Sequence, residues 1–222
     1  WMHTRTDRFP DGLSTLAAEI RETGCVPGLW LAPFAAAHNS QLAQQHPDWL
    51  ARWPNGRPIH GGSNWNGFWA LDPLSIAVRD YLAAVFAMVV GAWGFGFVKL
   101  DFLYASCIAP AGGMSRGELM ANVMDYLRKL CGPALMHVCG VPLASAFGRA
   151  DYCRIGCDVG LSWDGPPVEH YIHRERVSTK ASIANTLART QLNGRAFLND
   201  PDVWIGRSGP DISLSHEQKA LL

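Results

Sequence analysis

The chain has 222 residues, of which 48% are hydrophobic and 17% charged, as expected for a globular protein with one sizeable core. Its 19 Lys and Arg residues balance its 19 Asp and Glu residues, so it offers no basic field to nucleic acid or to an anionic membrane surface. The longest apolar stretch, residues 82–97, is interrupted by three glycines and is too short for a membrane span of about 18 residues. We therefore expect neither nucleic acid nor a membrane as a partner.

The cysteines form no CxxC pair, and most fall in predicted strands or at helix ends; they are Cys25, Cys107, Cys131, Cys139, Cys153 and Cys157. This pattern favours reduced thiols over a disulfide set and predicts a cytoplasmic protein. The chain begins with Trp1, shows no signal peptide, and ends at Leu222 inside a predicted helix that starts near Ser215. These features predict a longer natural polypeptide that is truncated here at both ends.

The first half of the chain alternates helical and extended patterns. Residues 10–23 carry apolar residues at helical spacing and predict a helix that stops at Gly24. The apolar run 26–34, bounded by prolines, predicts a buried strand. Asp72 and Pro73 predict the N-cap and first turn of a second helix, which extends to about Val90.

The second half continues the alternation. Residues 95–104 predict a strand, and Ser115 with Glu118 predicts a capping box for a helix that ends at Gly132. A helix is expected over residues 180–193, closed by Gly194. Three further strands are expected at residues 134–140, 152–159 and 196–199.

Five strands that alternate with helices predict an α/β fold with a parallel sheet, either a closed (β/α)8 TIM barrel or an open doubly wound sheet. No GxGxxG motif follows any strand, whereas polar residues end several strands, and this arrangement favours the barrel. A full barrel needs eight strands. We therefore expect residues 1–222 to form one partial barrel domain, containing about strands three to seven.

Lys99 and Asp101 are two residues apart in the strand predicted at 95–104, so they share a face with Phe97. The opposite face, directed toward the covering helices, is expected to carry Val98, Leu100 and Phe102. Charged side chains on an inward face are costly unless they are paired or used. Because Asp101 lies near the carboxyl end of the strand, where barrel active sites open, its position favours catalysis over a structural ion pair.

A second carboxylate ends a second strand. Alternation in the strand predicted at 152–159 places Arg154 and Asp158 on one face, together with Tyr152 and Gly156. The face behind them is expected to carry Cys153, Ile155 and Cys157. Two carboxylates on one rim are typical of glycoside hydrolases, where one attacks or activates water and the other protonates the departing oxygen.

Metal-dependent chemistry is the alternative enzymatic interpretation, because acidic barrel rims often bind metals. It needs clustered histidines or carboxylates, and the strands offer only His137. His170 and His173 lie in a loop with HxxH spacing. A lone core or loop histidine is the more common explanation of each, so we expect no metal ligand among them.

Several segments, taken in order, resemble glycoside hydrolase family 36, whose members include α-galactosidases. The segments are GLWLAPF followed by HPDWL, FVKLDFLY, HVCGVPL, YCRIGCDVG and LNDPD. The resemblance covers nearly the whole chain with plausible spacing and implies a TIM barrel in which Asp101 is the nucleophile and Asp158 the acid/base. It also implies that a galactose-binding subsite is lined by Trp30, Lys99, Cys139, Arg154 and Trp163. Barrel packing or a loop anchor remains the alternative for the tryptophans and the cysteine.

The resemblance implies hydrolysis of terminal α-linked galactose, as in melibiose- or raffinose-type oligosaccharides, by double displacement with retention and without a cofactor. In this mechanism Lys99 favours the ionised form of Asp101, while burial and the negative charge of Asp101 help Asp158 to hold its proton. The paired aspartates of the family's second strand, which bind sugar hydroxyls, would precede residue 1. Galactosyl transfer, as in raffinose synthases, and a non-catalytic carbohydrate-binding fragment stay open as alternatives, and the oligomeric state is not predicted.

The segment at residues 198–202 has a different expectation. Asn199, Asp200 and Asp202 are expected to form a structural turn at a strand end and to take no part in catalysis.

Overall fold

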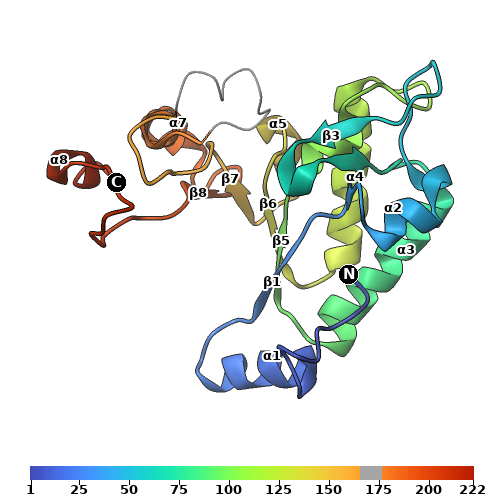
Figure 1. Cartoon of the computed structure of the whole chain (residues 1–222), viewed down its shortest axis with the longest axis horizontal. Coiled ribbons are helices and arrows are strands. Elements are labelled where there is room, and N and C mark those ends of the chain that lie inside the picture. Colours follow the sequence, from blue (N-terminus) through green and yellow to red (C-terminus); the bar gives the residue numbers. More distant parts are fainter. Residues whose placement is uncertain (166–176) are drawn as a thin grey trace. The chain divides into compact units, whose positions relative to one another are not determined.

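The computed structural model describes residues 1–165 and 177–222, which divide into two compact units, Trp1–Asp151 and Tyr152–Leu222. Figure 1 shows the chain coloured along its sequence, with the elements labelled. The HxxH residues His170 and His173 lie outside the described residues.

A three-stranded parallel sheet forms the centre of the first unit. Its strands are β1 (Gly28–Leu31), β5 (Phe97–Leu100) and β6 (Leu135–Val138), with β5 paired to both neighbours. One face of the sheet is fully buried and carries Leu31, Val98, Leu100, Met136 and Val138. The predicted alternation in β5 is thus confirmed for Val98 and Leu100, because apolar residues at every second position are covered on the core side.

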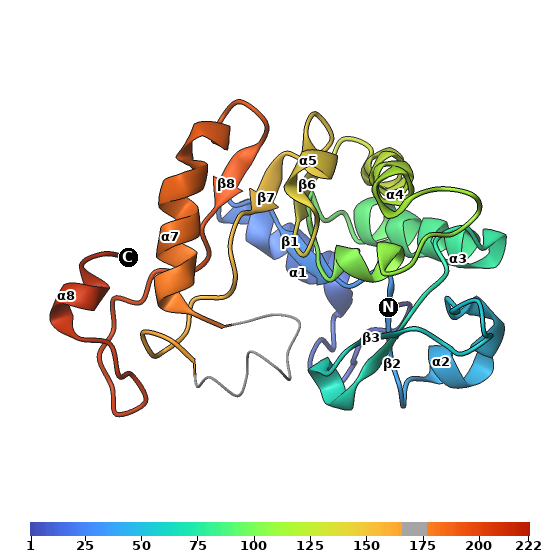
Figure 2. The same ribbon diagram turned by 90° about the horizontal axis from the view of Figure 1, so that it is seen from above.

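Helices α1 (Gly12–Glu22), α3 (Ile76–Phe86) and α4 (Arg116–Cys131) belong to the same unit, with the short helices α2 (Gln41–Gln45) and α5 (Leu143–Ala146). Helix α4 contacts both α3 and β6, and the two long helices run close together in Figures 1 and 2. The predicted capping box is present, since Ser115 and Glu118 each accept a hydrogen bond from the other's backbone N–H. Gly24 follows α1 with a φ of 84°, as predicted from its position.

The predicted start of α3 is wrong. The N-cap is Ser75, whose hydroxyl accepts from the N–H of Val78, and not Asp72. Asp72 instead caps the preceding turn, accepting a 2.9 Å hydrogen bond from the N–H of Leu74. After Phe86 the chain continues as a π-helix over Ala87–Ala92, which accounts for the length of the predicted helical run.

A small antiparallel sheet between β1 and α3 was not predicted. Its order is β2 (Ala35–Ala37), β4 (Phe68–Ala70) and β3 (His60–Gly62). The strands have three residues each, which is too short for a period-2 pattern to stand out. Gly61 is required here because a Cβ would lie only 2.0 Å from the ring of Phe68.

The second unit contains the parallel pair β7 (Tyr152–Arg154) and β8 (Leu198–Asp200), with helices α7 (Thr179–Arg189) and α8 (His216–Lys219). Ser178 caps α7 by accepting from the N–H of Ala181. Two predictions are corrected. The strand expected to reach Val159 ends at Arg154, and α8 ends at Lys219, so Leu222 lies outside a helix.

The five predicted strands correspond to β1, β5, β6, β7 and β8, and the parallel α/β class is confirmed. All six cysteines are free thiols. In the described ranges, no helix combines the length and apolar character needed to cross a membrane.

Candidate active site

The carboxyl edge of the first unit's sheet is built by strand register. Trp30 of β1 lies opposite Lys99 of β5, which lies opposite His137 of β6. The ladder continues one residue further, because the N–H of Asp101 donates to Leu31 and that of Cys139 to Leu100, each over 2.8 Å. Parallel strands therefore bring Trp30, Lys99, Asp101 and Cys139, which the sequence singled out separately, to a single edge.

Two N–H donors hold the carboxylate of Asp101. The indole Nε1 of Trp30 donates to Oδ2 over 3.0 Å, and the backbone N–H of Phe102 donates to Oδ1 over 2.7 Å. Among the described residues, no ion pair joins Lys99 to Asp101, and the influence of the lysine on the ionisation of Asp101 stays a prediction. Donors on both oxygens fix the direction in which the carboxylate points.

Phe102 departs from the predicted strand alternation. It follows the end of β5 with a φ of 54° and a ψ of 31°, so it lies in the left-handed region. Its ring lies among other aromatic rings, at centroid distances of 4.9 Å from Trp65 and 5.5 Å from Phe68. The expectation that Phe102 faces the covering helices is therefore wrong, because the β geometry that enforces alternation ends at Leu100.

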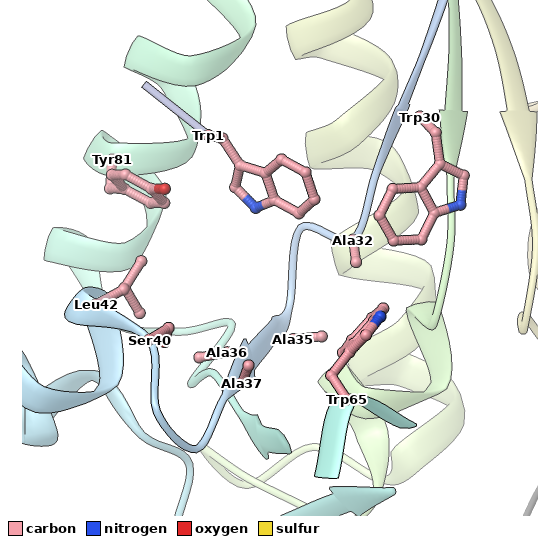
Figure 3. Close-up of a pocket in the computed structure, with 10 residues that line it drawn as sticks. All are labelled: Trp1, Trp30, Ala32, Ala35, Ala36, Ala37, Ser40, Leu42, Trp65 and Tyr81. Atoms are coloured by element: carbon pink, nitrogen blue, oxygen red, sulfur yellow. The ribbon is translucent and has the colours of Figure 1, made fainter. Parts of the chain in front are cut away.

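An apolar pocket of about 360 Å³ includes Trp30, the donor to Asp101, among its lining residues, whereas Asp101 itself does not line it. Figure 3 shows the indoles of Trp1, Trp30 and Trp65 around it, with Tyr81 on the far wall. The remaining lining residues are Ala32, Ala35, Ala36, Ala37, Ser40 and Leu42.

Two other residues at the same edge are largely enclosed. Cys139 is 9% exposed and His137 is 8% exposed. Among the described residues, no group of three or more His, Cys, Asp or Glu side chains is arranged to hold a metal ion.

In the second unit, one arginine forms ion pairs with three carboxylates. The side chain of Arg154 is 5% exposed, and its Nη2 lies 2.6 Å from Asp158 and 2.5 Å from Asp202. Its Nη1 lies 3.9 Å from Asp200. Behind the arginine, burial and then the charge of Asp200 raise the pKa of Cys153 to about 12, so this thiol stays protonated at neutral pH.

The backbone around Asp158 is anchored to the start of α7. Its carbonyl accepts a 2.9 Å hydrogen bond from Ser178, and two residues later Gly160 and Thr179 exchange hydrogen bonds. The side chain of Asp158 is nevertheless 64% exposed and paired with Arg154. The burial that was expected for Asp158 is therefore not found in this geometry.

The 198–202 segment has the structural role that the sequence suggested for it. Asp202 accepts the backbone N–H of Val159 over 2.8 Å and also pairs with Arg154, which ties the loop after β8 to the loop after β7. Asp200 accepts from the N–H of Asp202 over 2.9 Å. The carbonyl of Trp163 accepts from Lys180, so this loop too is attached to α7.

Sequence reasoning missed Trp65 and Phe102. Neither lies in a regular strand or on a helix face, so no periodic pattern marks them. The predicted residues form one group around Asp101 in the first unit and one around Asp158 in the second. That the two carboxyls face each other across a cleft stays a prediction.

A family model described as Melibiase matches residues 1–116. Among curated relatives, the chain is 28% identical to Alpha-galactosidase 2 of Pediococcus pentosaceus over 65% of its own length and 20% of the relative's. It is 35% identical to Alpha-galactosidase AgaA of Geobacillus stearothermophilus over 46% of its length and 13% of the relative's. The chain thus spans a fifth or less of these proteins.

A solved structure resembles the chain closely. It is an α-galactosidase from Thermus thermophilus in complex with p-nitrophenyl α-D-galactopyranoside, 35% identical, with a TM-score of 0.85. The match covers 97% of this chain and 44% of that one. A second structure of that enzyme, in complex with stachyose, matches with the same score. The solved relatives are TIM-barrel enzymes. The match covers nearly all of this chain but less than half of the Thermus thermophilus enzyme, which confirms a partial barrel.

Proposed function

Since the chain belongs to the Melibiase family, we propose that the polypeptide carrying it is a retaining α-galactosidase that releases terminal α-linked galactose. The observation that carries the proposal is the likeness, over 97% of the chain, to an enzyme crystallised with an aryl α-galactoside. Oligosaccharides of the raffinose type are the proposed substrates, since that relative was also crystallised with stachyose.

Asp101 is the proposed nucleophile. The proposal is supported by its position one residue past the end of β5, because barrel enzymes bind substrate at the carboxyl ends of their strands. The N–H groups of Trp30 and Phe102 orient its two oxygens, which supports attack from a defined direction on the anomeric carbon. The attack forms a galactosyl ester with Asp101 and releases the leaving oxygen.

Asp158 is the proposed acid and base. In the first step it gives its proton to the leaving oxygen, and in the second it takes a proton from the water that cleaves the ester. The exposed carboxyl is accessible to such a leaving group, and Arg154 holds it in one orientation. Because the side chain of Asp158 is exposed, the protein does not exclude water from it. A sugar bound over Asp158 would do so.

The test is made on the full polypeptide with a p-nitrophenyl α-galactoside. Asp101→Ala should remove turnover of every α-galactoside, and added azide should partly restore it by occupying the space of the carboxylate. The product of this rescue should be the β-galactosyl azide, because azide attacks from the side where Asp101 stood. An α-configured azide, or an Asp101→Ala variant with full activity, would contradict the assignment.

Asp158→Ala provides the matched comparison. It should keep more activity on aryl galactosides with good leaving groups than on poor ones, because good leaving groups need little protonation. Equal losses on both kinds of substrate would reject its role as acid.

A further inference from the structure

We propose that Trp65 is a positioning residue for Asp101: its indole holds in place the two residues whose N–H groups orient that carboxylate. The inference rests on the proposed function in taking Asp101 as the nucleophile. Its structural part, the support of a hydrogen bond by an aromatic ring, can be tested separately.

The contacts form a closed triangle of rings. Trp65 lies 4.9 Å from Phe102 and 6.0 Å from Trp30, and Trp30 lies 6.3 Å from Phe102. The interplanar angles of 61°, 75° and 87° are those of edge-to-face contacts, the favourable arrangement for aromatic pairs. Trp30 and Phe102 are the donors to Asp101, so Trp65 is the member of the triangle that contacts both donors and does not itself donate.

The backbone of Phe102 needs this support. A φ of 54° is unusual for an aromatic residue, and such conformations persist where the surroundings hold them in place. The ring contacts with Trp65 and Phe68 provide that constraint. If they are lost, Phe102 can relax, and the N–H that reaches Oδ1 of Asp101 over 2.7 Å moves with it.

The antiparallel sheet brings Trp65 to this place. Trp65 lies in the short turn Asn64–Asn66 between β3 and β4, with a φ of 57°, and its ring also contacts Phe68 at 5.6 Å. It is 46% exposed, so the core alone does not account for a large aromatic residue in a strained turn. In Figure 3 it lies beside Trp30 at the pocket wall.

The first experiment does not depend on activity. Hydrogen exchange of the Trp30 indole N–H, with its resonance assigned through Trp30→Phe, reports the hydrogen bond to Asp101. Trp65→Ala should accelerate this exchange, and Trp65→Phe, which keeps a ring in contact, should restore the slow rate. Trp53→Ala removes an indole of similar exposure, 41%, from the turn before β3 and should leave the rate unchanged. Exchange unaffected by Trp65→Ala would overturn the inference, whatever the fate of the proposed function.

The second experiment measures catalysis by the full polypeptide, after Asp101→Ala has been shown to be inactive. Calorimetric titration with galactose gives both the fraction of competent sites and their affinity. Trp65→Ala should lower kcat per competent site by up to about 10²-fold with unchanged galactose affinity, since a misplaced nucleophile slows chemistry. Trp65→Phe should recover most of the loss.

Two results would overturn the kinetic part. If kcat per competent site is unchanged and only the competent fraction falls, Trp65 stabilises the fold and does not position Asp101. If galactose affinity falls in step with kcat/KM while kcat is retained, Trp65 is a binding residue.

Discussion

Asp101 and Asp158, the two carboxylates proposed for catalysis, are held by different kinds of chemistry. In the first unit, neutral N–H groups from Trp30 and Phe102 orient Asp101 within a cluster of aromatic rings. In the second, the cation Arg154 holds Asp158 together with Asp202 and Asp200. The comparison teaches that packing determines the orientation of one carboxylate and charge that of the other, so different substitutions should disturb each.

The largest effect on stability is expected from Arg154→Met. Its side chain is 5% exposed, and its loss removes the cation that lies 2.5 Å from Asp202, whose side chain is 14% exposed. Removing one partner of a buried ion pair costs about 3–5 kcal/mol, because the other charge stays buried and unpaired. The loss is measured as the change in the free energy of unfolding in urea.

Arg207→Met is the control for that prediction. Arg207 and Asp211 form an ion pair with the same i,i+4 spacing as Arg154 and Asp158, but their side chains are 57% and 47% exposed. Solvent screens an exposed pair, so Arg207→Met should change the free energy of unfolding much less than Arg154→Met. Comparable losses for Arg154→Met and Arg207→Met would mean that burial does not distinguish them and that the charge network is not structural.

A smaller effect separates the partners of Arg154. Asp202→Ala should lower the free energy of unfolding by about 2–3 kcal/mol, because the partly buried N–H of Val159 loses its acceptor. Asp158→Ala, at a side chain that is 64% exposed, should cost less than about 1 kcal/mol. The two are compared by denaturant midpoints at constant m-value. A larger loss for Asp158→Ala would reverse the assignment of structural and catalytic roles.

The smallest effect tests the first unit. Trp30→Phe keeps an aromatic ring against Trp65 and Phe102 but removes the N–H that donates to Asp101. The loss of one hydrogen bond of about 1 kcal/mol should lower kcat roughly fivefold to tenfold, with little change in thermal stability. Steady-state kinetics on an aryl α-galactoside measures it. An unchanged kcat would show that Phe102 alone suffices to orient the carboxylate.

The positions of the five parallel strands, and of the capped helices between them, could be predicted from the sequence. Alternating apolar residues within 97–100 and 135–138 form one buried face, and Ser115 and Glu118 cap α4 through contacts within one turn. Asp101 and Asp158 were singled out as carboxylates near the carboxyl ends of predicted strands, although β5 ends at Leu100 and β7 ends at Arg154. These features depend on residues close together in the sequence, so short sequence patterns are enough to predict them.

The partners of those carboxylates required the tertiary structure. Trp65 and Phe102 have left-handed backbone conformations. Such residues belong to no regular strand or helix, so the periodic patterns used to interpret the sequence do not include them. Lys99 lies two residues from Asp101, yet Trp30, from a strand 71 positions away, provides the hydrogen bond. The sequence by itself thus determined which parallel strands form and which acids follow them. The tertiary structure decided which groups hold those acids, because parallel pairing joins residues that are far apart in the chain.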